Sequence, residues 1–277
     1  MRLSTSDDQI YHLNYSLSYI ERMERLYRAG FRVLDLNLTD YQHDGSPFRA
    51  PDWKAWLLGI RDRAAELGVT FTQSHAPVYN FGVPGYYDDE KHELMRRSFE
   101  ACEILGIPWL VLHISRPPLA SLEETESLNR AYIQALLPWA YAHRVGIAVE
   151  NLAAHREPPD APSRSFLQTP EALLAFVENF SDAQVGICID LGHALIQGWD
   201  VPRTIDVVGR KLRALHVQDN NGVDDQHMPP FFGKIPWPEV MRSLKRNAYA
   251  GDFTYELCGP MLMRNAPEAL QDAMHAL

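Results

Sequence analysis

Short runs of apolar and β-branched residues recur along the chain, and polar stretches of helical character separate them. Several runs are apolar almost throughout, which is typical of strands that are covered on both faces, as in a parallel sheet. The pattern predicts eight strands, one near residue 3 and the others at 32–38, 69–75, 109–115, 146–151, 185–191, 212–219 and 252–258.

Amphipathic stretches lie between most of these runs. The first four reach a glycine at their ends, namely Gly30, Gly68, Gly106 and Gly146, and glycine tolerates the left-handed conformation in which many helices end. Eight alternating units predict an α/β fold, a single (β/α)8 TIM barrel. With 46% hydrophobic residues and no linker or low-complexity segment, residues 1–277 are expected to form a single TIM-barrel domain.

Side chains that favour metals occur at the far ends of six of the predicted strands. They are His75, His113, Glu150, Asp190, His216 and Glu256, at intervals of 26 to 40 residues. Because parallel strands joined by helices all point the same way, their far ends meet at one rim of the barrel. We therefore expect these imidazoles and carboxylates to converge on a divalent ion.

The last four of these residues form the expected metal site. Glu150, Asp190, His216 and Glu256 offer three carboxylates and one imidazole, a set that suits Mn²⁺, Mg²⁺, Co²⁺ or Zn²⁺. The set contains no cysteine, which argues against a structural zinc site and favours catalysis. Cys188 and Cys258 share strand faces with Asp190 and Glu256 and are expected to fill the barrel interior.

Three further donors follow in the loops beyond strands six and seven. His193 lies three residues after Asp190, and Asp225 and His227 are two residues apart, so that both can lie on one side of an extended loop. Together they are sufficient for a second metal ion or for holding a polar substrate.

Composition narrows the class of partner. The chain has 26 basic and 36 acidic residues, and a formal charge of −10 disfavours nucleic acid as a partner. Three cysteines without CxxC spacing indicate a reducing compartment. The first residues form no apolar signal segment, and no apolar run approaches the roughly 20 residues that cross a bilayer. A cytoplasmic protein without a membrane partner is expected.

Three long loops leave strand ends that carry these donors, at 76–90, 151–169 and 219–237, and such loops often bind ligands. Arg156, Arg164 and Lys234 are candidate contacts for a phosphate, so that a sugar and a sugar phosphate both stay open. The substrate pocket is expected to be lined by Trp109, Phe231, Phe232, Lys234 and Trp237.

The strings SHAP, VLH, VEN, CIDLGH, LHVQDNNGVDDQH, GKIPW and YEL resemble, in this order and over nearly the whole chain, the xylose isomerase-like barrel superfamily. The resemblance implies a small sugar or polyol substrate and one catalytic divalent ion. It also implies that Glu150 and Glu256 exchange a proton with the carbon next to the substrate carbonyl. Members are often dimers or tetramers, which makes a homo-oligomer a further expectation.

Two other activities in this superfamily use the same positions. In its endonuclease IV class, residues matching His75, His113, His193, Asp225 and His227 complete a three-zinc cluster that cleaves DNA at abasic sites. Inosose and dehydroshikimate dehydratases instead expel water. The segments LHISRPP and ENLAAHR lack the His-Pro-Gly and Thr-Ala-Gly stretches usual in the nucleases, and together with the charge they favour an isomerase or epimerase of sugars or sugar phosphates.

Overall fold

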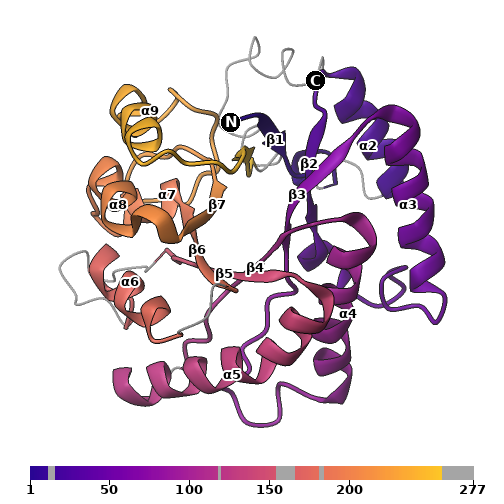
Figure 1. Ribbon diagram of the computed structural model, residues 1–277, viewed down its shortest axis with the longest axis horizontal. Helices are drawn as coiled ribbons and strands as arrows, with labels where there is room; N and C mark the ends of the chain where they lie inside the picture. The colour runs from indigo at the N-terminus through magenta and orange to yellow at the C-terminus, as the bar shows by residue number, and fades with distance from the viewer. Residues whose placement is uncertain (12–15, 118–119, 154–165, 181–183, 258–277) are drawn as a thin grey trace.

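The computed structural model describes residues 1–11, 16–117, 120–153, 166–180 and 184–257. Eight strands stand around a common centre, and the helices lie outside them (Figure 1). The strands are β1 (Leu3–Thr5), β2 (Val33–Asn37), β3 (Thr70–His75), β4 (Trp109–Leu112), β5 (Gly146–Glu150), β6 (Val185–Asp190), β7 (Leu212–His216) and β8 (Phe253–Tyr255).

All eight strands form one sheet in the order β7-β6-β5-β4-β3-β2-β1-β8, and neighbouring strands in this order are parallel. The seam between β7 and β8 is bridged at Val217 and Tyr255. There the amide of Val217 donates to the carbonyl of Thr254 at 2.8 Å, and the amide of Glu256 donates to the carbonyl of Val217 at 3.1 Å. The sheet is therefore a nearly closed cylinder, and the predicted (β/α)8 barrel is confirmed.

The helices surround this cylinder. They are α1 (Asp8–Tyr11), α2 (Tyr19–Arg28), α3 (Trp53–Leu67), α4 (Asp89–Leu105), α5 (Leu122–His143), α6 (Pro170–Glu178), α7 (Leu191–Ile196), α8 (Val201–Val208) and α9 (Trp237–Arg246), with short 3₁₀ turns η1 (Leu38–Tyr41) and η2 (Gly209–Lys211). Among the described residues, no helix is both long enough and apolar enough to span a bilayer.

Local sequence explains how several helices begin and end. Ser18 and Ser121 form capping boxes at the starts of α2 and α5. Gly68 and Gly106 end α3 and α4 in the left-handed conformation, as predicted. The prediction for the fourth helix is wrong, because Arg144, with φ of 57°, is the left-handed residue that caps α5, and Gly146 begins β5 instead.

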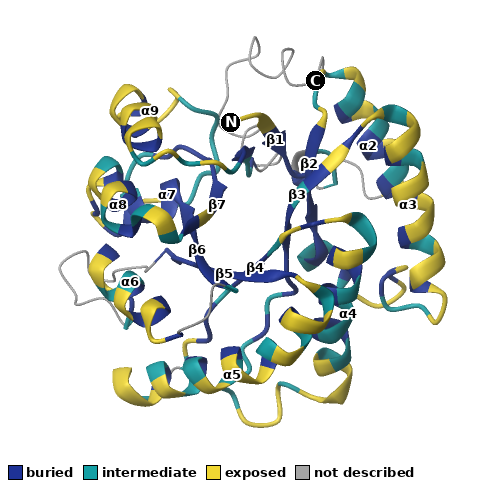
Figure 2. Cartoon of the chain, in the orientation of Figure 1, coloured by how far each residue is buried: buried dark blue, intermediate teal, exposed yellow. Residues whose placement is uncertain are grey.

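The core has an outer and an inner part. Between the sheet and the helices, apolar side chains from both form one large cluster, and the strands are the most deeply buried part of the chain (Figure 2). Inside the barrel, the small side chains of Val111, Ala148, Cys188 and Ala214 pack together beneath Trp109. The interior position of Cys188 is thus confirmed, while Cys258 lies outside the described residues.

Candidate metal centre at the carboxyl end of the barrel

Strand register places the predicted donors at one end of the cylinder. His75, Glu150, Asp190 and His216 are the last residues of β3, β5, β6 and β7. His113 and Glu256 each follow shortly after a strand, β4 and β8. Asp190 is the cross-strand partner of His216. Because all strands are parallel, their carboxyl ends lie on one face of the barrel.

The central group contains Glu150, Asp190, His216 and Glu256, whose ligand atoms all lie within 4.8 Å of one another. His216 Nδ1 is 3.1 Å from Glu150 Oε1 and 3.3 Å from Glu256 Oε2. Asp190 Oδ2 is buried without a hydrogen-bond partner among the described residues. Three carboxylates in so small a space repel one another, and a divalent cation neutralises such a cluster. This donor set fits a divalent metal ion.

The electrostatics of the group reflect this crowding. Burial, followed by the charges of Glu150 and Asp190, raises the pKa of Glu256 well above its ordinary value. Burial would also raise the pKa of Glu150, but the imidazoles of His216 and His113 outweigh it and lower that pKa well below the ordinary value. The pKa values of the two glutamates are thus shifted in opposite directions.

A second group lies next to the first and shares Glu150 with it. Nε2 of His113 and Nε2 of His75 lie 3.0 Å and 3.4 Å from Glu150 Oε2, and these two nitrogens are 3.1 Å apart. The two imidazoles therefore point at the same place as the carboxylate. Thr39, which sequence analysis missed, positions the ring of His75 through a contact of 3.0 Å with its Nδ1 atom.

The third group consists of His193, Asp225 and His227. Asp225 Oδ2 is 3.2 Å from His193 Nε2 and 3.4 Å from His227 Nε2. The Nδ1 atoms of both rings lie near backbone carbonyls, those of Asn151 at 3.0 Å and Glu256 at 2.9 Å, so both rings are fixed with Nε2 toward the carboxylate. Hydrogen bonds from the two histidines oppose the effect of burial and lower the pKa of Asp225.

Two supporting residues were not predicted from the sequence. Asn151 bridges β5 and β6, since its Nδ2 donates to the carbonyl of Asp190 at 3.0 Å and its Oδ1 accepts from the amide of Asp190 at 2.8 Å. Gln218 donates to Asp225 Oδ1 at 2.7 Å. Asn151 could have been noticed as the polar neighbour of Glu150, whereas nothing in the sequence points to the partner of Gln218.

Asp219 organises the long loop after β7. Its carboxylate accepts hydrogen bonds from the backbone amides of Phe231 and Ile235, both at 3.1 Å, and from Nε1 of Trp237 at 2.8 Å. Gly233 is required in this loop, because a Cβ there would lie 2.3 Å from the carbonyl oxygen of Asn220. One buried carboxylate therefore holds the loop that carries Asp225 and His227.

The predicted substrate pocket is only partly consistent with this loop. Trp237 begins α9 and is 2% exposed, so its ring packs in the core, where it donates to Asp219. Phe231 and Phe232 are 77% and 51% exposed, and Lys234 is exposed as well. Arg156, Arg164 and most of the 151–169 loop lie outside the described residues.

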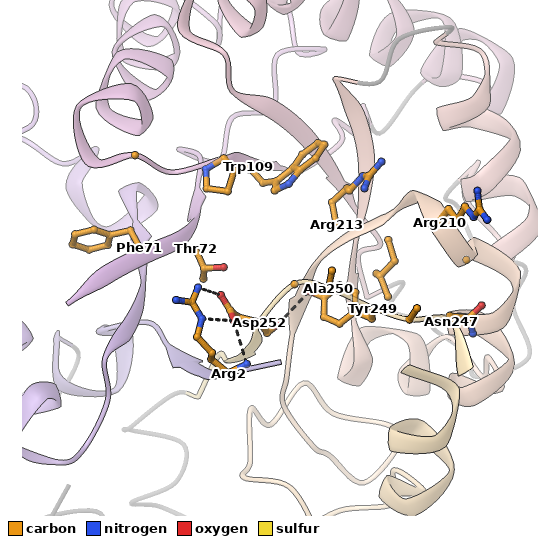
Figure 3. A pocket seen from close by; sticks show the side chains of 16 residues that line it. Arg2, Phe71, Thr72, Trp109, Arg210, Arg213, Asn247, Tyr249, Ala250 and Asp252 are labelled. Carbon is orange, nitrogen blue, oxygen red and sulfur yellow. Dashed lines mark hydrogen bonds and ion pairs between the residues drawn. The ribbon is translucent and has the colours of Figure 1, made fainter. Parts of the chain in front are cut away.

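The prediction that Trp109 lines the substrate pocket is wrong. Trp109 begins β4, whereas His113 follows the end of the same strand, so the two side chains lie at opposite ends of the barrel. Trp109 lines a cavity of about 580 Å³ at the amino end, where the guanidinium of Arg213 lies 5.2 Å from the centre of its ring (Figure 3). Gly146 makes room for it, because a Cβ at that position would lie 2.1 Å from the indole.

The barrel and its donor groups define a class, the parallel (β/α)8 barrels with acidic and histidine donors at the carboxyl end. The family model described as xylose isomerase-like TIM barrel matches residues 23–277. The chain belongs to this family.

Curated relatives are similar over different lengths. An uncharacterized protein of Methanocaldococcus jannaschii is 26% identical over 222 residues, which are 77% of this chain and 72% of that protein. Fructoselysine 3-epimerase of Escherichia coli O157:H7 is 38% identical over 69 residues, 25% of each chain. Probable endonuclease 4 of Methanoculleus marisnigri is 26% identical over 216 residues, 70% of this chain and 73% of that protein.

Solved structures share the fold over the whole chain. A D-tagatose 3-epimerase-like protein superposes with a TM-score of 0.76 at 22% identity, covering 99% of this chain and 97% of that one. The IolI protein with a bound zinc atom gives a TM-score of 0.75 at 18% identity, covering 100% and 96%. A probable 3-DHS dehydratase of Bacillus anthracis gives 0.75 at 13% identity, covering 99% and 98%.

Proposed function

We propose that this protein is a divalent-metal-dependent isomerase or epimerase of a sugar or sugar phosphate. The observation that carries the proposal is the central group. In it, two glutamates, Glu150 at the end of β5 and Glu256 directly after β8, both contact Nδ1 of the same imidazole, that of His216. Moving a proton on a carbon next to a carbonyl needs a base, an acid and a positive centre to hold the charge on oxygen.

Glu150, Asp190, His216 and Glu256 would hold the ion. A divalent ion polarises a ketose carbonyl and stabilises the negative charge that forms on its oxygen when the neighbouring carbon loses a proton. The chain must then supply the proton transfer itself. In the central group, Asp190 also caps helix α7, because its Oδ1 accepts a hydrogen bond from the amide of His193 at 2.6 Å. Glu150 and Glu256 cap none of the described helices.

Asp190 thus also caps the start of α7, whereas the two glutamates would act at carbon. One would take the proton, and the other would return a proton to the same carbon or to its neighbour. Returning it to the same carbon from the other side gives epimerisation, and returning it to the neighbour gives isomerisation. His193, which lies 3.5 Å from Glu150 Oε1 through Nδ1, would orient a substrate hydroxyl.

The comparisons support a sugar substrate. The short segment shared with fructoselysine 3-epimerase has the highest identity of the three relatives described above, and the fold is that of a D-tagatose 3-epimerase-like protein. The formal charge of −10 also favours a small substrate over DNA.

The proposal is tested by incubating the protein with Mn²⁺ and a panel of ketoses in D₂O. Deuterium is expected at C3 for an epimerase or at C1 for an isomerase, and Glu256→Gln should slow its uptake by about 10²- to 10⁴-fold. Asp252→Asn, which changes a carboxylate at the opposite end of the barrel, is the matched control and should keep the exchange. Absence of exchange with every ketose, in protein shown to be metal-loaded, would overturn the proposal.

A second candidate is a trinuclear hydrolase of abasic DNA, because donor groups that contain His75 and His113 and that contain Asp225 and His227 lie beside the central group. This candidate predicts three zinc ions per chain and nicking of a duplex that contains an abasic site. One ion per chain, with exchange at carbon and no nicking, would exclude it.

A further inference from the structure

A buried carboxylate inside the barrel faces the back of the central group. Asp35 lies on β2 and is 2% exposed. Its Oδ2 atom accepts a hydrogen bond from Nε2 of Gln73 on β3 at 2.9 Å. The same oxygen is 3.9 Å from Nε2 of His216, a distance of an ion pair that is too long for a hydrogen bond.

The orientation of the His216 ring gives this contact its significance. Nδ1 of His216 points at Glu150 and Glu256, so Nε2 points away from the central group and into the barrel. An imidazole that offers the Nδ1 lone pair to a cation must, when neutral, carry its proton on Nε2. That proton needs an acceptor inside the barrel.

Both residues have a buried polar atom with unused hydrogen-bonding capacity, and in Asp35 this atom is Oδ1, whereas the oxygen nearest His216 is Oδ2. Nε2 of His216 and Oδ1 of Asp35 are buried and have no hydrogen-bond partner among the described residues. A buried polar atom left in this state costs roughly 1–3 kcal/mol, so such atoms call for an explanation. One is a potential donor and the other an acceptor.

The position of Asp35 is itself fixed by neighbouring strands. Gln73 contacts the carbonyl of Leu215 on β7 at 3.4 Å as well as Asp35, and its Oε1 accepts from Thr254 Oγ1 on β8 at 3.4 Å. The amide of Gln73 thus ties four strands together around the carboxylate. A carboxylate held this way can serve as a fixed acceptor.

We propose that Asp35 is a positioning residue that accepts the Nε2 proton of His216 and holds the ring with Nδ1 toward the metal site. The inference rests on the proposed function, since it concerns the same ion. Asp35 touches neither the ion nor the substrate in this arrangement. Asp35 orients the ring of His216, and Gln73 in turn holds the carboxylate of Asp35 in place.

The test compares zinc affinity in the wild type, in Asp35→Asn and in Asp252→Asn, by competition with a chromophoric chelator. Asp35→Asn removes the charge and keeps the size, and it should bind zinc roughly 10- to 100-fold more weakly. Asp252→Asn, which alters a buried carboxylate paired with Arg2 at the other end of the barrel, should bind zinc like the wild type. Equal affinities in all three proteins would overturn the inference while leaving the metal site intact.

A second measurement separates positioning from folding. In zinc-loaded wild type labelled with ¹⁵N-histidine, the spectrum should show His216 with its proton on Nε2. A ring protonated on Nδ1 instead would overturn the inference even if Asp35→Asn failed to fold. If the wild type itself bound no divalent ion, the proposed function would fail first, and the two failures are thereby distinguished.

Discussion

His216 and Glu150 are 66 residues apart in the chain, yet Nδ1 of the imidazole lies 3.1 Å from Oε1 of the carboxylate. Glu150 ends β5 and His216 ends β7, and β6 stands between them with Asp190 at its end. Glu150 also belongs to the group with His75 and His113. The carboxylate of Glu150 lies within 3.5 Å of four imidazoles, those of His75, His113, His193 and His216.

Metal removal should destabilise the protein. The three carboxylates of the central group repel one another when ionised, so a bound cation should stabilise the folded state. At a free Mn²⁺ concentration of about 100 times Kd, the gain should be about 2.7 kcal/mol. Thermal unfolding with Mn²⁺ and with EDTA would measure it, and a melting temperature insensitive to both would contradict a site in this protein.

Substituting the glutamates should separate binding from chemistry. Glu256→Gln removes one proton carrier from the central group, and it should lower the rate of deuterium exchange by about 10²- to 10⁴-fold. Glu150→Gln should lower this rate as well, and it should weaken metal binding more, because Oε1 of Glu150 contacts His216 while its Oε2 lies within 3.4 Å of both His75 and His113. Isothermal titration with Mn²⁺, beside the exchange assay, would compare the two; stronger binding loss in Glu256→Gln would contradict the assignment.

Asp219 should control the loop that carries Asp225 and His227. Asp219→Ala leaves four hydrogen-bond donors without their acceptor and should destabilise the fold by at least about 2 kcal/mol in urea unfolding. Asp224→Ala is the matched control on the same loop, because its carboxylate is exposed and pairs with Asn221 at 2.9 Å. Similar losses in the two variants would argue against the anchoring role.

A cluster of acids near β1 should make stability depend on pH. Burial, followed by the charges of Asp8 and Asp7, raises the pKa of Asp40 to about 9. The folded state therefore keeps a proton that the unfolded chain releases near pH 4, and this contribution to stability is lost as pH rises from about 4 toward 9.

Asp40→Asn imitates the protonated form of Asp40 and should remove this dependence. At pH 8 the metal-free variant should be more stable than the wild type by about 1–3 kcal/mol, a range reduced because the side chain is only partly buried. Near pH 4 the two proteins should be alike. Urea unfolding at both pH values would show it, and a variant less stable at pH 8 would contradict the shifted pKa.

The sequence was sufficient for the fold and for the residues that gather at its carboxyl end. Apolar runs and glycine-terminated helices depend on local chemistry, and Gly68 and Gly106 end helices as their position indicated. Because every strand runs the same way, the last residue of each run had to reach the same rim. That is why Glu150, Asp190 and His216 could be grouped without coordinates.

Only the tertiary structure decided which individual side chains lie at that rim and which residues they contact. Trp109 and His113 are four residues apart but lie at opposite ends of β4, and Trp237 supports the loop from the core instead of lining a pocket. Asp35 and Asp219 gained roles from partners on other strands and loops. Such partners are set by the closure of the barrel and the path of its loops, which a linear pattern of polar and apolar residues does not encode.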